Sequence, residues 1–265
     1  MNFFTQIDIK EGLNKARIED GVFSHISDFS IINLKKESEL HFSTEGSEVC
    51  LVILEGSCDI KIDGKTFSNL GSRANVFSGK PTAVYIPRNK RYSLIAKNVQ
   101  LAMCSSVSDK DSNFKIIYPQ DINEKQVGRD NWSREVRLII DRDAGSTNLI
   151  VGETLNPAGN WSGTPAHKHE VDNPPSESHH EELYYFKCDK KNGFGIERFY
   201  SPNRGINELI YLKENTVTLM PWGYHQIVAA PGYTLYYLFF LSGPSNKLIG
   251  NPDPEHKWIN EQTHK

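Results

Sequence analysis

The feature that most constrains this chain is a series of short runs of β-branched and aromatic residues, separated by glycine and proline. These runs occur at residues 49–54, 83–86, 136–140, 182–186, 216–220 and 235–241. Runs of this length between turn residues are typical of strands in a β-sandwich or β-barrel. No segment sustains an apolar period of 3.6 residues, so we expect helix to be minor. The predicted fold class is therefore all-β.

A weak internal repeat indicates two similar units. Residues 83–87 read AVYIP and residues 218–221 read TLMP, so in both places proline stops an apolar strand and a turn follows. The second turn leads to His225, whereas the first contains no histidine. We predict two tandem barrels, of which only the second is equipped for metal. A polar stretch at 119–128 separates them, which gives an N-terminal domain of residues 1–124 and a C-terminal domain of residues 125–265.

Composition and charge exclude several classes of partner. The formal net charge of -3 provides no basic excess that could neutralise nucleic-acid phosphates. The first residues, MNFFTQIDIK, lack the basic and apolar regions of a signal peptide, and no apolar stretch is long enough to span a membrane. The four cysteines are far apart and form no Cys-x-x-Cys pair, so we expect them to be reduced. We therefore expect a cytoplasmic protein with neither a nucleic-acid nor a membrane partner.

Four residues of the second half form a candidate metal site. His167 and His169 are separated by one residue, so they share one face of a strand. Glu182 opens the next aromatic strand, and His225 follows a Pro-x-Gly turn. A His-x-His pair alone is weak evidence, but the downstream Glu and His in an all-β chain strengthen it. Three imidazoles and one carboxylate suit a divalent zinc, iron, manganese or nickel ion and leave positions for substrate or water.

The loop before Glu182 leaves alternatives to this ligand set. Glu181 could replace Glu182, but Glu182 would share its inward face with Tyr184, as alternation along a strand requires. His179 and His180 are expected to be solvated loop residues rather than ligands.

With this pattern in place, the sequence resembles the metal cupins and, more narrowly, the family of 5-deoxy-glucuronate isomerases that is shared with the 4-deoxy-uronate isomerases. The similarity covers nearly the whole chain and is carried by PAHKHEVDNPP at 165–175, EELYY at 181–185, GFGIERFY at 193–200, GYHQIVAAPGY at 223–233 and GSRANVFSG at 71–79. The sequence departs from the family pattern at His179 and His180, where an apolar or aromatic pair is usual, and at Trp222, where a basic residue is usual.

The resemblance implies two tandem cupin barrels (double-stranded β-helices, or jelly rolls), of which the N-terminal one is degenerate and metal-free. It also implies an enzyme, an aldose–ketose isomerase that converts 5-deoxy-glucuronate into 5-dehydro-2-deoxy-gluconate in myo-inositol catabolism. The substrate would be a small sugar acid, and the cofactor would be one divalent metal ion, zinc, manganese or iron. Exposed edge strands and a metal-free barrel further favour a homo-oligomer.

Isomerisation needs a proton carrier that is distinct from the metal ligands. The candidates are Glu197, Lys168 and Tyr224, and alternation does not decide whether Glu197 or Arg198 faces the cavity. Arg198, if it points inward, would bind the substrate carboxylate in a bidentate pair. Tyr184 is a candidate for sugar binding, although aromatic residues on strands more often fill a barrel.

Two other functions are compatible with the same residues, because a fold alone does not fix function. A cupin dioxygenase would use iron in the same site and would consume oxygen. A sugar-acid-binding cupin would bind its ligand without turnover.

Overall fold

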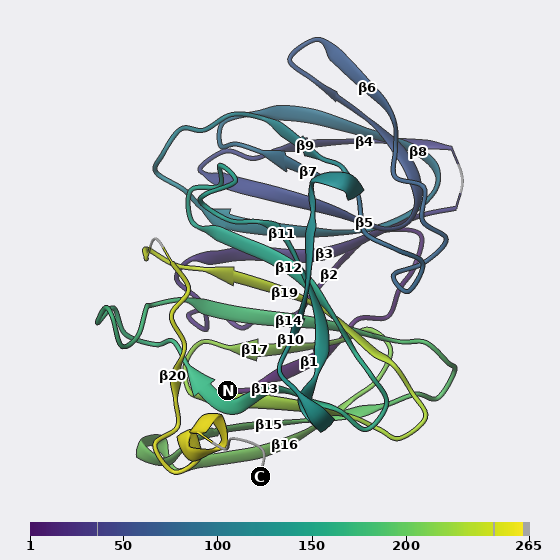
Figure 1. Cartoon of the computed structure of the whole chain (residues 1–265). Coiled ribbons are helices and arrows are strands. Elements are labelled where there is room, and N and C mark those ends of the chain that lie inside the picture. Colours follow the sequence, from purple (N-terminus) through teal and green to yellow (C-terminus); the bar gives the residue numbers. More distant parts are fainter. Residues whose placement is uncertain (36, 246, 262–265) are drawn as a thin grey trace.

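The computed structural model describes residues 1–35, 37–245 and 247–261, and its regular structure is almost entirely β (Figure 1). The prediction of an all-β fold is confirmed. The N-terminal half forms an eight-stranded sheet of order β2-β3-β8-β5-β7-β9, in which β4 also pairs with β8 and β6 with β5. Its strands are β2 (Gly12–Lys15), β3 (Ile26–Leu34), β4 (Ser38–Ser43), β5 (Ser47–Ile62), β6 (Lys65–Leu70), β7 (Ala83–Ile86), β8 (Arg91–Val107) and β9 (Lys115–Ile117).

The C-terminal half contains two further sheets (Figure 1). The larger has the order β1-β17-β14-β19-β12-β11-β10, with strands β1 (Phe4–Gln6), β10 (Asn123–Val127), β11 (Arg134–Ile140), β12 (Leu149–Asn156), β14 (Glu181–Cys188), β17 (Thr216–Met220) and β19 (Leu235–Ser242). The smaller has the order β16-β15-β18-β13-β20, with strands β13 (Trp161–Lys168), β15 (Gly195–Ser201), β16 (Ile206–Leu212), β18 (Tyr224–Ala229) and β20 (Asn251–Pro252).

Helical structure in the described residues consists of short 3-10 turns. These are η1 (Pro119–Asp121), η2 (Asp130–Trp132), η3 (Pro202–Arg204) and η4 (Lys257–Glu261). None of the described helices has the length and apolar character needed to cross a membrane.

The core consists of three apolar clusters, and side-chain alternation along β14 connects two of them. Tyr184 and Phe186 belong to a cluster between the two C-terminal sheets, whereas Leu183 and Tyr185 face the N-terminal half. The ring of Tyr185 lies 5.7 Å from that of Phe29 in this shared cluster. A third cluster fills the interior of the N-terminal half. One face of β14 therefore points into the C-terminal interior and the other joins the two halves.

Two strands that begin before residue 125 belong to the larger C-terminal sheet. β1 belongs to the first residues of the chain but pairs with β17, so it lies among the C-terminal strands in Figure 1. β10 begins at Asn123 and pairs with β11, which places it in the larger C-terminal sheet.

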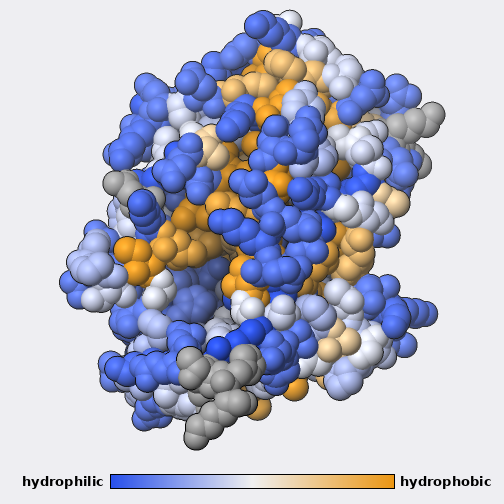
Figure 2. Space-filling model, in the orientation of Figure 1, coloured by the Kyte–Doolittle hydropathy of each residue, from blue (hydrophilic) through white to orange (hydrophobic). Residues whose placement is uncertain are grey.

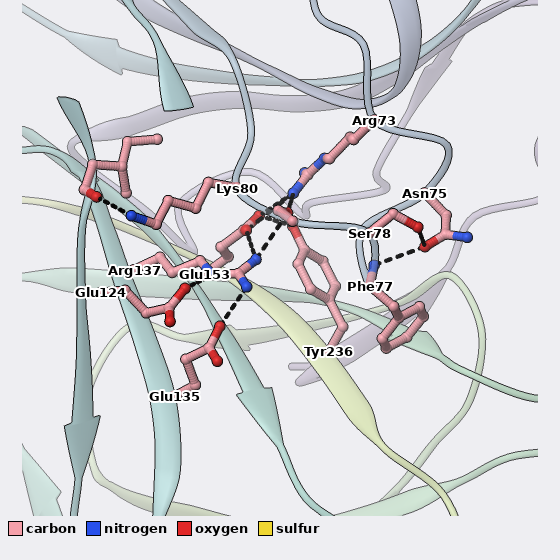
Figure 3. Close-up of polar contacts among 12 residues, drawn as sticks. Arg73, Asn75, Phe77, Ser78, Lys80, Glu124, Glu135, Arg137, Glu153 and Tyr236 are labelled. Atoms are coloured by element: carbon pink, nitrogen blue, oxygen red, sulfur yellow. Dashed lines mark hydrogen bonds and ion pairs between the residues drawn. The ribbon is translucent and has the colours of Figure 1, made fainter. Parts of the chain in front are cut away.

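A buried ion network also connects the halves (Figure 3). The Glu153 carboxylate is fully buried on β12 and accepts hydrogen bonds from Arg73, Arg137 and Tyr236. Arg73 comes from the loop before β7, and its Nη1 lies 3.0 Å from Glu153 Oε1. Breaking a buried pair by removing one partner is typically destabilising by about 3–5 kcal/mol, so this contact holds the loop against the C-terminal sheet.

Hydrophobic side chains gather in a band across the middle of the face shown in Figure 2. The band lies over the region where Figure 1 shows β11, β12 and β19. A groove of about 790 Å³ in the surface is lined by Leu138, Ile150, Phe239 and Leu248, among others.

Candidate functional site

Three imidazoles meet at one end of the C-terminal interior. His167 lies on β13 directly opposite His225 on β18, and His169 follows the end of β13. The ring of His225 is 4.9 Å from that of His167 and 5.3 Å from that of His169. One ring nitrogen of each histidine lies within 4.8 Å of those of the other two. Strand pairing and alternation therefore gather three potential ligands that are far apart in sequence.

The Glu182 carboxylate lies among these imidazoles. Its Oε2 atom is 3.0 Å from His169 Nε2 and 3.1 Å from His225 Nε2, and the residue is only 4% exposed. Burial alone would raise the pKa of Glu182, but the neighbouring imidazoles of His169 and His225 hold it well below its usual range. Glu182 is therefore an anion that faces the ring nitrogens of His169 and His225.

The hydrogen bonds of His169 determine which ring nitrogen faces the site. Its Nδ1 atom lies 2.7 Å from the backbone oxygen of His180, to which it donates. In a neutral ring this leaves an unprotonated Nε2 facing the Glu182 carboxylate, so two lone pairs would meet. Burial lowers the pKa of His169, but the hydrogen bond and charge of Glu182 outweigh it and raise the pKa. This position therefore favours a cation, either a proton or a metal ion.

His167 lies between two glycines. Its ring is 3.8 Å from where a Cβ of Gly163 would stand, and only 2.6 Å from the corresponding point on Gly250. Burial, followed by the charges of His225 and His169, lowers the pKa of His167 to about 3. His167 is the most exposed of the three imidazoles, and at neutral pH it presents an unprotonated nitrogen.

These residues fit a divalent metal ion. His225 is 1% exposed, and in the described part of the chain its Nδ1 atom has no hydrogen-bond partner. Its Nε2 atom lies 3.1 Å from Glu182 Oε2 but outside hydrogen-bond geometry. Buried polar atoms in native proteins are nearly always paired, so an unpaired imidazole beside a carboxylate indicates a missing partner. Three neutral nitrogens and one carboxylate oxygen are a common donor set for zinc, iron and manganese.

Two further polar side chains point into the same interior. Glu197 on β15 is fully buried, and neither of its carboxylate oxygens has a hydrogen-bond partner among the described residues. Its pKa is raised to about 8, mainly by burial; the Thr218 hydroxyl opposes this rise and the charge of Glu182 adds to it. The ring of Tyr184 lies 5.8 Å from that of His225, and burial together with the charge of Glu182 raises its pKa well above the usual value. At neutral pH both side chains are therefore proton donors.

The remaining candidates lie on the opposite face of the smaller sheet. Lys168 is paired with Glu170, and its ammonium group lies 5.8 Å from the ring of Tyr224. Arg198 stacks over Tyr200 at 3.9 Å and donates to Asn207. Because β13, β15 and β18 alternate, residues next to His167, Glu197 and His225 must point away from the interior. The structure therefore brings Glu197 and Tyr184 to the metal candidates but does not bring Lys168, Tyr224 or Arg198 there.

The loop before β14 contains contacts that the sequence did not reveal. His180, expected in solvent, is 1% exposed, and its Nε2 atom has no partner among the described residues. Burial and the charge of His169 lower its pKa to about 4. The Glu181 carboxylate points away from the imidazoles and accepts backbone hydrogen bonds from the N-terminal half. A single sequence contains no signal for the burial of His180 or for the hydrogen bonds of Glu181.

Sequence comparison supports a specific relationship. A model described as the KduI/IolB family matches residues 11–259. A protein of Bacillus licheniformis named 5-deoxy-glucuronate isomerase is 35% identical over 238 residues, which cover 89% of this chain and 88% of that protein.

Two solved structures share the fold. An IolB-like protein from Salmonella typhimurium is 26% identical and superposes with a TM-score of 0.93, covering 98% of this chain and 100% of that one. Oxalate decarboxylase from Lactobacillus farciminis is 11% identical, with a TM-score of 0.69 over 99% of this chain and 91% of that one. The second likeness concerns the fold alone, which is of the cupin type.

Proposed function

This chain belongs to the KduI/IolB family, and on that basis we propose that it converts 5-deoxy-glucuronate into 5-dehydro-2-deoxy-gluconate, with one divalent metal ion as cofactor. Its relatives at 35% identity are named isomerases, so the chain is an enzyme of an isomerase family that serves inositol breakdown. The observation that carries the metal is a group of three imidazoles whose ring nitrogens lie within 4.8 Å of one another, with the Glu182 carboxylate 3.0 and 3.1 Å from two of them, His169 and His225.

His167, His169, Glu182 and His225 would hold the ion. A divalent ion bound there supplies Lewis acidity, which stabilises the negative charge that develops on the substrate oxygens during isomerisation. His180 fixes the ring of His169 through its backbone oxygen, so that Nε2 faces the site.

Glu197 is the proposed proton carrier. Aldose–ketose isomerisation moves a proton from one carbon to its neighbour, so the carrier must both accept and return that proton. With its pKa raised to about 8, a fraction of Glu197 is ionised near neutral pH. This carboxylate can accept the proton from one carbon, and the carboxyl group so formed can return it to the neighbouring carbon. Its two oxygens have no other hydrogen-bond partner among the described residues, which leaves them available to a substrate.

Tyr184 is the proposed substrate-binding residue. Its phenol stays neutral because burial and the charge of Glu182 raise its pKa, so it can donate a hydrogen bond to a hydroxyl or carboxylate oxygen of the sugar acid. Its ring lies next to both His225 and Tyr237, at centroid distances of 5.8 and 4.9 Å, which keeps it in place.

The chain is further proposed to consist of two tandem barrels, residues 1–124 and 125–265. The division follows the sheets, because the strands of the eight-stranded sheet all precede residue 124. β1 and the first residues of β10 are exceptions, since both lie in the larger C-terminal sheet.

The test is an isomerisation assay with 5-deoxy-glucuronate, in which NMR follows the ketose product. The protein is assayed as purified, after metal removal and after reconstitution with zinc, manganese or iron. Product that requires metal supports the proposal. Metal-loaded protein that forms no product would overturn it, and turnover of a 4-deoxy-uronate instead would assign the chain to the other activity associated with the family.

A further inference from the structure

The side chains of the first two residues of β14 point to opposite faces of the strand. Glu182 points into the interior, where its Oε2 atom lies 3.0 Å from His169 Nε2. Glu181 points toward the N-terminal half, is 4% exposed, and accepts hydrogen bonds from the backbone N–H groups of Ser24, His25 and Ile26 at 2.6, 2.8 and 3.0 Å. A charged acceptor that receives three backbone donors makes strong, directional bonds. The start of β14 is thereby fixed from both sides.

The position of Glu182 depends on this fixed point. Glu181 is the first residue of the strand, and a loop of more than ten residues connects it to His169. Consecutive residues on a strand share one backbone and project to opposite faces, so a shift or rotation at Glu181 moves the Glu182 carboxylate as well. Metal ligands must lie within about 0.2 Å of their preferred distances, so even a small movement would weaken binding.

The N-terminal half contains the same arrangement in reverse. Glu48 on β5 is fully buried and accepts hydrogen bonds from the backbone N–H groups of Thr147, Asn148 and Leu149 at 2.8, 2.6 and 2.8 Å. The next residue along β5 is the apolar Val49, which belongs to the interior cluster of that half.

In each half, therefore, one glutamate binds the backbone at the start of a strand in the other half. We call these contacts the Glu181 clamp and the Glu48 clamp. Between the two clamps, the hydroxyl groups of Ser106 and Ser242 are hydrogen-bonded to each other at 2.5 Å. The two clamps differ in the residue after the glutamate, which is a ligand candidate after Glu181 and a valine after Glu48.

We propose that Glu181 is a positioning residue for the metal site, through which the N-terminal half sets the place of the Glu182 carboxylate. This inference rests on the proposed metal-binding function. It explains why the N-terminal half, in whose described residues no group of three metal-ligating side chains lies, donates three backbone hydrogen bonds next to the site of the other half.

The experiment compares Glu181→Gln with Glu48→Gln, because the two substitutions weaken equivalent clamps. Metal affinity is measured by competition with a chromogenic chelator, and folding stability by urea unfolding of the metal-free protein. Substituting a residue that orients a ligand typically lowers metal affinity about 10- to 100-fold, and we expect that loss in Glu181→Gln. Glu48→Gln should lower stability but change metal affinity less than about threefold, because it is remote from the ligands.

Glu181→Asp is the second variant if Glu181→Gln does not fold, since it keeps the charge but withdraws the carboxylate by one methylene. It should weaken metal binding as well, and hydrogen exchange at the amides of 24–26 should become faster. Equal metal affinity in wild-type protein and in the folded Glu181 variant would overturn the positioning role alone. A wild-type protein that binds no metal would overturn the proposed function and this inference with it.

Discussion

The interiors of the two halves contain equivalent strand pairs with opposite chemistry. On β5, Val49 pairs with Ile86 of β7, and at the corresponding place in the C-terminal half Glu182 pairs with Met220. Two residues further along, Leu51 pairs with Val84, whereas Tyr184 pairs with Thr218. The backbone arrangement is thus shared, and the side chains decide whether the interior is an apolar core or a polar cavity.

The same contrast holds for the histidines. His225 lies opposite His167 on β13. Its sequence counterpart in the N-terminal half, Arg91, lies opposite Ser43, and both of these residues are exposed, while the neighbouring pair Phe42 and Tyr92 belongs to the apolar cluster. Unpaired buried polar atoms follow this division: among the described residues, those of the N-terminal half belong only to Arg73 and Gln100. An apolar interior is stable without a ligand, whereas a cavity of unpaired polar groups is costly unless something binds there. The apolar interior of the N-terminal half therefore needs no ligand, whereas the unpaired polar groups of the C-terminal half are the ones that a ligand could satisfy.

The largest difference in metal affinity should come from substituting His225 and, in the other half, its sequence counterpart Arg91. His225→Ala removes a ligand, and we expect metal affinity to fall on the order of 100- to 1000-fold, because each of the four ligands carries a large share of the binding free energy. Isomerase activity should disappear with it. Arg91→Ala, at the exposed first residue of β8 in the other half, should leave both unchanged. Metal content after dialysis and the chelator competition measure the metal affinity of both variants. An equal loss in the two variants would contradict the assignment of the metal site to the C-terminal half.

The pH dependence of unfolding tests how much the buried Glu197 carboxyl group destabilises the metal-free protein. In the metal-free folded protein its pKa is raised to about 8, whereas an unfolded Glu titrates near 4.3. Between these values the folded state binds one proton more than the unfolded state, so stability falls as the pH rises and levels off above about pH 8. Glu197→Gln removes this loss, so near pH 9 the variant should be more stable than the wild type by on the order of a few kcal/mol, a gain that fades toward pH 4.

Urea unfolding at pH 5, 7 and 9 with a chelator present measures this difference. Glu208→Gln is the matched control, because Glu208 lies on the adjacent strand β16 but is exposed. A pH dependence that is the same in wild type and Glu197→Gln would show that the carboxyl is solvated rather than buried.

Much of the strand arrangement could be predicted from sequence because it depends on local pattern. The apolar runs at 83–86, 216–220 and 235–241 fall within β7, β17 and β19. The convergence of His167 and His169 was likewise predictable, since it follows from a spacing of two in an extended segment, although β13 itself ends at Lys168. The same rule also points Lys168 and Tyr224 outward, because each is adjacent to an inward histidine.

Other features depend on contacts between distant residues, which no local pattern encodes. Whether Glu197 or Arg198 faces inward depends on the register of β15 against β18, where Glu197 lies opposite Ile227. β1 joins a sheet whose other strands all follow residue 122, and the Glu181 clamp connects residues more than 150 positions apart. Such contacts arise from the packing of one half against the other.

The smallest expected effect concerns the glycine beside His167. A Cβ at Gly250 would stand 2.6 Å from Cδ2 and 3.2 Å from Cγ of His167, so Gly250→Ala must push the ring aside. The ring can move toward Gly163, where a Cβ would still be 3.8 Å away, so we expect about a tenfold loss of metal affinity rather than its abolition. Gly46→Ala in the N-terminal half is the control, because its Cβ would meet no atom within 4 Å. Adding Gly250→Ala to a His167→Ala background should produce no further loss, since the two changes act on the same ligand. A further loss of metal affinity in that background would mean that Gly250 affects the site through a residue other than His167. The difference in space around Gly250 and Gly46 would then no longer explain the result.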